Sequence, residues 1–236
     1  MLQRVLLIAS AIIILIGVSG CMWKKNEPSV KEQVEKYMKD KYNEEFKVLG
    51  GGTEGWNDPN EEIYVKSEKF PDEMILIRRG KKSGEMIDNY MDFLMKSKIE
   101  EVMNGIVSEI YPKSKVFFNT DGPPHAGATP QMSVEEYLEY LSKYRSLSLI
   151  ICINDPNYKA NKDEKLEQLR LRFEEKQYIS DLTMYYILDG KADLINSDNW
   201  REVLNGPSAR EWWALRGDFL MDKSYKFHYS EWREVK

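Results

Sequence analysis

Cysteine and histidine, the residue types best suited to nucleophilic and metal chemistry, are rare in this chain of 236 residues. There are two cysteines, Cys21 and Cys152, and two histidines, His125 and His228. A zinc site usually draws on several such ligands, and neither H-E-x-x-H nor a paired C-x-x-C occurs. We therefore expect no metal and no cofactor. His125 falls in a proline-rich segment and is predicted to be exposed, and His228 is predicted to lie at a surface or interface.

Cys152 stands inside the apolar run Leu149-Ile150-Ile151-Cys152-Ile153. A reactive thiol needs an electropositive and partly open setting, because the thiolate is the nucleophile. A buried apolar strand offers the reverse. Cys152 is therefore predicted to be an inert core residue.

Carboxylates are the abundant residue type with catalytic potential, with 39 Asp and Glu residues in the chain. The nucleophile motifs G-x-S-x-G and S-x-x-K are both absent. Nothing in the spacing of the acidic residues selects an acid–base pair. No catalytic residue is assigned, and carboxylate-dependent hydrolysis stays open as an alternative.

Aromatic residues gather near the C-terminus, where eight fall within 33 residues: Trp200, Trp212, Trp213, Phe219, Tyr225, Phe227, Tyr229 and Trp232. Tryptophan and tyrosine are enriched at binding surfaces because they bury a large area while keeping a polar tip. They also pack cores, which is the alternative interpretation. Trp212 and Trp213 are the candidate partner-binding pair, since adjacent helical residues point about 100° apart and one ring can stay exposed.

Cys21 closes an apolar segment at the N-terminus, Val5–Val18, which follows the single basic residue Arg4. Its length suits the apolar region of a secretory signal, about 7–15 residues. A bilayer-spanning helix needs about 20, and Trp23 with the lysines after it ends this run. The segment therefore predicts export from the cytoplasm.

The end of this segment, Val18-Ser19-Gly20-Cys21, resembles the lipobox of bacterial lipoproteins. The resemblance implies that a diacylglyceryl group is added to the Cys21 sulfur and that cleavage follows Gly20. Two acyl chains hold a protein stably at a bilayer where one is marginal. We therefore expect a domain anchored to the cell membrane through lipid and facing outside the cytoplasm. An ordinary signal peptide or an uncleaved anchor helix is the alternative.

The charge balance bears on the class of partner. Removal of residues 1–20 takes away Arg4 as its only charged residue, so the net charge changes from −5 to −6. A mildly anionic domain gains nothing from phosphate backbones. Nucleic acid is therefore not an expected partner, and the composition, rich in Lys, Ile, Asn and Glu, is typical of a Gram-positive source.

Hydrophobic periodicity and turn residues predict the elements that must position these side chains. In the first half we expect a helix at 29–42, strands at 46–49, 62–66 and 74–79, a long helix at 85–111 and a strand at 116–118. In the second half we expect a helix at 133–144, a buried strand at 147–153, a helix at 162–178, a strand at 182–188, a short helix capped by Ser208 and a strand at 225–229. Capping boxes at Ser29 and Ser133 mark two of these helix starts.

This order predicts an α+β fold, with antiparallel sheets and amphipathic helices packed on one face. The two halves share a loose plan, which favours similar halves, although no residue-level repeat is visible. The expected division is a signal peptide at 1–20, a tether at 21–28, an N-terminal half at 29–118, a Pro/Gly linker at 119–130 and a C-terminal half at 131–236.

Lys41-Tyr42-Asn43-Glu44-Glu45-Phe46 and Asp88-Asn89-Tyr90 are similar to segments of Gram-positive lipoproteins of unknown activity. We favour a lipid-anchored binding or interaction protein with a protein or envelope partner. The reason is that the sequence carries a signal for its location at the membrane but no motif for a catalytic reaction. The alternatives are an immunity-type lipoprotein that neutralises a secreted toxin and a carboxylate-dependent envelope hydrolase.

Overall fold

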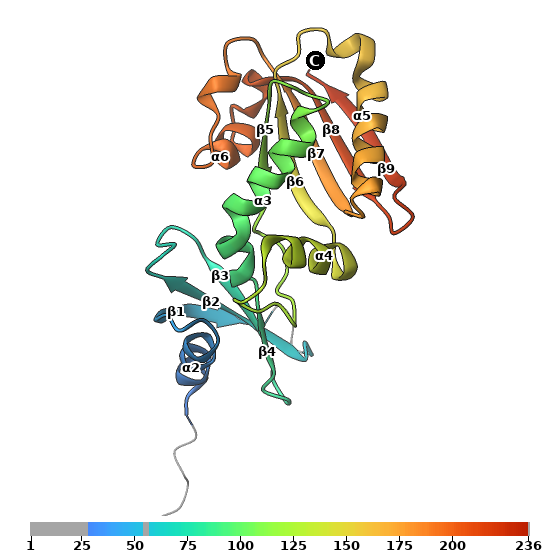
Figure 1. Ribbon diagram of the computed structural model, residues 1–236. Coiled ribbons are helices and arrows are strands. Elements are labelled where there is room, and N and C mark those ends of the chain that lie inside the picture. The colour runs from blue at the N-terminus through green and yellow to red at the C-terminus, as the bar shows by residue number, and fades with distance from the viewer. Residues whose placement is uncertain (1–27, 54–56, 236) are drawn as a thin grey trace, which may run out of the picture.

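The computed structural model describes residues 28–53 and 57–235. It confirms the α+β class, with two sheets and helices laid against them (Figure 1). Cys21 and the expected signal peptide lie outside the described residues.

The first sheet is antiparallel throughout, in the order β1 (Phe46–Gly52), β2 (Asn60–Ser67), β3 (Ile75–Gly80) and β4 (Met86–Asp88). The second runs in the order β5 (Ser114–Phe118), β6 (Leu147–Ile153), β7 (Ser180–Ile187), β8 (Trp213–Met221) and β9 (Phe227–Glu234). Its strands are antiparallel except β6 and β7. That parallel pair requires a crossover, which helix α5 supplies.

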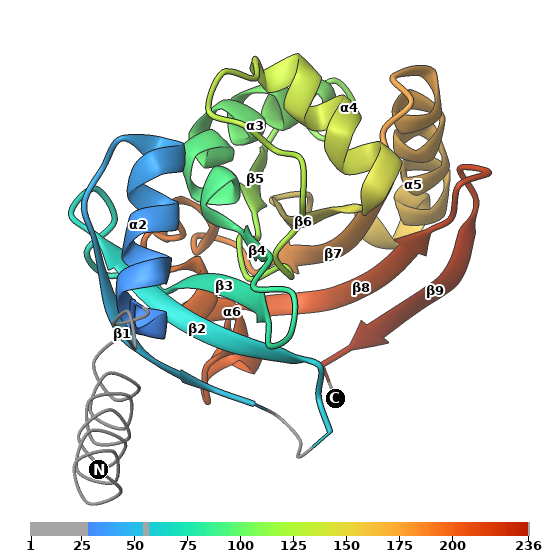
Figure 2. The ribbon, with the colours of Figure 1, turned by 90° about the horizontal axis from the view of Figure 1, so that it is seen from below.

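The helices within the described residues are α2 (Val30–Tyr42), α3 (Tyr90–Ser108), α4 (Val134–Tyr144), α5 (Tyr158–Glu175) and the short α6 (Trp200–Asn205). Both expected capping boxes are present: Ser29 pairs with Glu32, and Ser133 with Glu136. In each box the Ser hydroxyl oxygen accepts the Glu backbone N–H, and the Glu carboxylate accepts the Ser backbone N–H. Figure 2 shows α2 over the first sheet and α3, α4 and α5 along the second.

One core runs through the whole molecule, from Val34 in α2 to Met221 in β8. A second, smaller core lies on the opposite face of the second sheet, where Phe117 and Trp200 stack with ring centroids 5.9 Å apart. It is covered by α6 and by the short 3₁₀ helix Ala192–Leu194, with Trp212 and Trp213 packed against it. The second sheet is thus covered on both faces, with α5 and α6 on opposite sides (Figure 1).

Three expected helices differ from the structure. The helix expected at 162–178 is α5, which begins earlier, at Tyr158, and ends at Glu175. The helix predicted from residue 85 begins at Tyr90, because Met86–Asp88 pair with β3 as a strand and the Asp88 carboxylate accepts the Tyr90 N–H at 3.0 Å. Ser208 does not cap an α-helix but precedes a 3₁₀ turn, Ala209–Glu211. The chain then enters β8, a strand that the sequence prediction missed.

Several strand ends differ from the expected ones, among them the end of β1, the starts of β2 and β5 and both ends of β9. The glycines after Leu49 do not stop β1, which continues to Gly52 because all three glycines pair with β2. A Cβ at Gly51 would overlap the Glu62 carbonyl oxygen, so the close approach of the strands requires glycine there. The last strand begins at Phe227, since Tyr225 adopts a left-handed turn conformation with φ of 58°.

The segment 119–130 runs across the start of α3. His125 forms a backbone bridge with Asp88, and its N–H donates to the Asp88 carbonyl at 3.3 Å. The Asn89 amide donates to the Thr120 carbonyl at 3.3 Å. Strand β5, which precedes this segment, pairs with β6, which follows it. The segment therefore packs His125 onto the first sheet and leads directly into α4.

Candidate functional site

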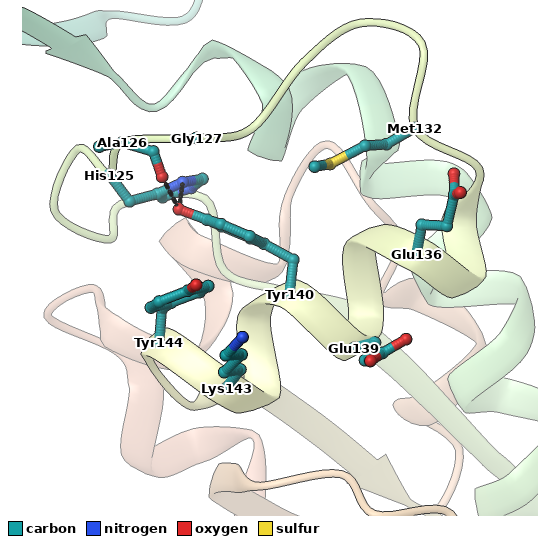
Figure 3. Close-up of a pocket in the computed structure, with 9 residues that line it drawn as sticks. All are labelled: His125, Ala126, Gly127, Met132, Glu136, Glu139, Tyr140, Lys143 and Tyr144. Carbon is teal, nitrogen blue, oxygen red and sulfur yellow. Dashed lines mark hydrogen bonds between the residues drawn. The ribbon is translucent and has the colours of Figure 1, made fainter.

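A groove of about 740 Å³ lies beside α4 (Figure 3). Its walls come from the loop before α4 and from the outward face of that helix: His125, Ala126, Gly127, Met132, Glu136, Glu139, Tyr140, Lys143 and Tyr144. A concave site with apolar walls and a few convergent polar groups is the usual form of a ligand site.

Helical spacing places three tyrosines along α4. Tyr137 faces inward and is fully buried. Tyr140 and Tyr144 follow at intervals of three and four residues and lie side by side, with ring centroids 4.9 Å apart. Tyr144 is 63% exposed, which is more than any other large hydrophobic or aromatic residue of the described chain. The helix thus carries a tyrosine ladder from the core to solvent.

A hydrogen-bonded network joins this ladder to His125. The imidazole Nδ1 lies 3.2 Å from the Tyr140 hydroxyl, and Nε2 lies 3.1 Å from the Tyr137 hydroxyl. The Tyr140 hydroxyl also donates to the Ala126 carbonyl, as Figure 3 shows. The network fixes the loop, the imidazole and the helix as one wall.

Behind this wall lies a buried carboxylate, Asp92, in the first turn of α3. Its Oδ1 accepts from the Tyr137 hydroxyl at 2.7 Å and from Arg145 Nη2 at 3.0 Å. The nearest His125 nitrogen is 3.7 Å from the same oxygen. A buried charge requires such partners, and together they tie α3, α4 and the loop to one oxygen atom.

Burial sets the ionisation of the Tyr137 and Tyr140 hydroxyls. It raises the pKa of Tyr137 far above the usual range, and the adjacent Asp92 charge raises it further. Burial also raises the pKa of Tyr140, with a smaller contribution from Tyr144. Both hydroxyls therefore stay protonated near neutral pH and act as hydrogen-bonding groups rather than as nucleophiles.

A second buried carboxylate, Asp88, lies at the end of β4. It accepts the hydroxyls of Tyr37 and Tyr42, each at 2.6 Å, and the Lys41 ammonium at 2.7 Å. With the Tyr90 N–H it receives four donors, so it acts as a clamp between α2 and α3. Within residues 28–53 and 57–235 there is no group of three or more His, Cys, Asp or Glu that could hold a metal ion.

The structure places the sequence candidates as follows. The prediction for His125 was wrong, since its side chain is only 10% exposed and packs between Tyr137 and Tyr140. Proline and glycine indicate an irregular backbone, but tertiary packing decides whether that backbone is covered. His228 is exposed on β9, as predicted. Cys152 is 2% exposed, as predicted, and burial raises the pKa of its thiol to about 12.

Trp212 and Trp213 are half-buried and pack against the smaller core. The Trp213 ring meets Tyr185 edge to face with centroids 5.8 Å apart, and Lys191 lies over the Trp212 ring at 5.2 Å. Neither belongs to the groove beside α4. Their role in partner binding stays a prediction, as does lipidation of Cys21.

Sequence reasoning did not single out Tyr144, Tyr140 or Asp92. The spacing of Tyr137, Tyr140 and Tyr144 after the Ser133 capping box was a visible signal for a tyrosine row on one helix. No local pattern marks Asp92, because its partners come from other elements.

No protein-family model matches the chain, and comparison with curated proteins finds no match. Among solved structures, the chain is similar to the crystal structure, at 2.55 Å resolution, of a DUF5037 family protein from Ruminococcus gnavus. The sequences are 16% identical, the TM-score is 0.39, and the likeness covers 85% of this chain and 95% of that one. In the part of the chain that the structure describes, no helix combines the length and apolarity needed to cross a membrane.

Proposed function

We propose that this protein is a lipid-anchored binding protein that presents the groove beside α4 to a partner outside the cytoplasm. The signal-like segment that ends in Val18-Ser19-Gly20-Cys21 supports the location and the anchor. The groove supports a binding role.

The exposure of Tyr144 is the observation that carries the proposal. A tyrosine that is 63% exposed on the wall of a hollow is the kind of residue that anchors a partner. Two neighbours contact the Tyr144 ring: the Tyr140 ring packs against it, and the Lys143 ammonium lies 5.1 Å from its centroid. A rigid aromatic wall loses little conformational freedom on binding, which favours affinity.

The buried carboxylates Asp88 and Asp92 and the groove residue Glu136 give little support to the hydrolase alternative. Asp88 and Asp92 are buried and hydrogen-bonded to donors within the protein. Glu136, at the groove, accepts the Ser133 N–H at 2.7 Å in its capping box. A toxin-neutralising lipoprotein is a special case of the binding function, and the identity of the partner separates the two.

Site-specific photo-crosslinking in intact cells tests the groove. A photoreactive phenylalanine analogue replaces Tyr144 in one strain and Leu194 in another; Leu194 is 59% exposed and lies away from the groove. We expect a discrete adduct from position 144 and none from position 194. No adduct at 144, or the same adducts at both positions, would contradict the proposal.

Membrane attachment is tested separately with Cys21→Ser. We expect the variant protein to be released or to stay unprocessed, while the parent protein remains in the membrane fraction with lipid on Cys21. Mass spectrometry that shows a mature N-terminus elsewhere, without lipid, removes the anchor from the proposal.

A further inference from the structure

The His125 imidazole stands between two hydroxyls of α4, with Nδ1 3.2 Å from the Tyr140 hydroxyl and Nε2 3.1 Å from the Tyr137 hydroxyl. The Tyr140 hydroxyl also contacts the Ala126 carbonyl (Figure 3). The Tyr137 hydroxyl lies 2.7 Å from the Asp92 carboxylate. Carbonyl and carboxylate oxygens only accept hydrogen bonds, and a hydroxyl has one proton to donate. The protonation state of the imidazole therefore decides which of these acceptors receives a proton.

The charged imidazole satisfies all of these contacts together. With a proton on each nitrogen, it donates to both tyrosine oxygens, and each hydroxyl donates its own proton onward. The positive charge faces the Asp92 carboxylate, whose oxygen lies 3.7 Å from Nε2. The contacts in the structure are thus those that an imidazolium makes.

A neutral imidazole has one N–H, so one of the two hydroxyls must donate to the bare nitrogen and give up its other acceptor. Tyr137 keeps Asp92, because hydrogen bonds to charged acceptors are about twice as strong as neutral ones and Asp92 is fully buried. The carbonyl of Ala126 belongs to an exposed residue and can bond to water instead. Loss of the proton therefore turns the Tyr140 hydroxyl from Ala126 to Nδ1.

The other charged groups around the imidazole come from every element that packs on it. Asp92 of α3 is paired with Arg145, which follows α4, at 3.0 Å. Asp88 of β4, whose backbone bridges to His125, is paired with Lys41 of α2 at 2.7 Å. Both buried carboxylates keep these partners in either state of the imidazole. The groove side adds Glu136, Glu139 and Lys143. Among these residue types, histidine is the one that changes charge between about pH 5 and about pH 8.

We propose that the hydrogen bond from Tyr140 to the Ala126 carbonyl is a pH-dependent latch, closed when His125 is protonated and open when it is neutral. Ala126 and Tyr140 both line the groove, one from the loop and the other from α4. The closed latch joins these two walls, so the protonated state is preorganised for binding. The effect on binding rests on the proposed function, whereas the latch itself does not.

Nuclear magnetic resonance of the full-length protein in detergent tests the latch. Ala126 and Gly127 form the only Ala-Gly pair in the sequence. Labelling with ¹³C-carbonyl alanine and ¹⁵N-glycine therefore gives a single correlation, from the peptide group that Tyr140 contacts. The ¹⁵N signals of the imidazoles are followed in the same titration, and His228→Gln assigns the two histidines.

We expect the Ala126 carbonyl signal to shift with the same midpoint as the His125 imidazole, and the neutral imidazole to carry its proton on Nε2. In Tyr140→Phe the carbonyl signal should no longer follow the imidazole. Tyr144→Phe, which removes the next hydroxyl on the same helix, should leave the carbonyl titration as in the parent.

Two results overturn the latch. One is an Ala126 carbonyl signal that does not follow the imidazole in the parent, or follows it equally in Tyr140→Phe. The other is a neutral imidazole with its proton on Nδ1, because release would then occur at Asp92 and not at Ala126.

The crosslink from position 144 tests the effect of the latch on the groove. We expect about fivefold more adduct at about pH 5 than at about pH 8, which corresponds to one neutral hydrogen bond. The difference should vanish in Tyr140→Phe. Equal adduct at both pH values overturns the regulation of binding. If position 144 gives no adduct at either pH, the proposed function fails, and the carbonyl titration still decides the latch.

Discussion

Removal of the Asp88 carboxylate is the sharpest test of how the molecule is held together. In Asp88→Ala, the hydroxyls of Tyr37 and Tyr42 and the ammonium of Lys41 lose their shared acceptor at once. The Tyr90 N–H, at the start of α3, loses its acceptor too. The change therefore separates α2 from α3 without altering an apolar side chain.

The expected loss of stability in Asp88→Ala follows from the burial of the Asp88 carboxylate. Removing one partner of a buried ion pair costs about 3–5 kcal/mol, and each orphaned hydroxyl costs about 1–3 kcal/mol. The Lys41 side chain is 20% exposed, so its ammonium regains some water and the ion-pair cost falls toward the lower limit. These costs are not additive, and we expect a loss of about 4 kcal/mol in the free energy of unfolding. Asp88→Asn keeps one acceptor oxygen and should lose about half as much.

Equilibrium urea unfolding followed by circular dichroism measures these differences. The matched control is Asp40→Ala, which breaks the exposed Lys36–Asp40 pair on the outer face of α2. Exposed pairs of this kind contribute less than about 1 kcal/mol. If Asp88→Ala costs less than about 1 kcal/mol, or no more than its control, Asp88 is not the clamp that its contacts indicate.

Three further expectations concern buried side chains. Cys152 should resist thiol reagents until urea unfolds the domain, because burial raises its pKa to about 12, and rapid labelling of the folded protein would show an open strand. Trp212→Ala and Trp213→Ala should each lower the free energy of unfolding in a urea melt, by up to about 3 kcal/mol, because both half-buried rings pack against the smaller core. A partner-binding role for the pair requires that one of these changes reduces recovery of crosslinked partner while stability stays nearly intact; large losses of stability from both would leave the pair without a binding role. Burial raises the pKa of Tyr185 to about 12 from 10.0, so its contribution to stability is complete below about pH 10 and is lost as the pH rises through 12. Phenolate absorbance should report this late titration, and normal ionisation of Tyr185 in the folded protein would contradict it.

Local patterns in the sequence were sufficient for much of the fold. The capping boxes at Ser29 and Ser133 mark helix starts that the structure confirms, because the Ser and Glu of each box are three residues apart. The apolar run of β6 predicts a buried strand and an inert Cys152, since both depend on the neighbouring side chains along the chain. Strand β8 was missed because Trp213–Met221 mixes charged and apolar residues, and its pairing with β7 and β9 decides its conformation.

The candidate site depends on contacts that no local pattern contains. Asp88 and Tyr37 are separated by 51 residues, and Asp92 and Arg145 by 53. The burial of His125 follows from its bridge to Asp88 and from the tyrosines of α4. Helical spacing determined by itself that Tyr137, Tyr140 and Tyr144 lie along one helix. Only the tertiary structure decided which ring is buried and which is exposed, because burial depends on the elements that pack around the helix.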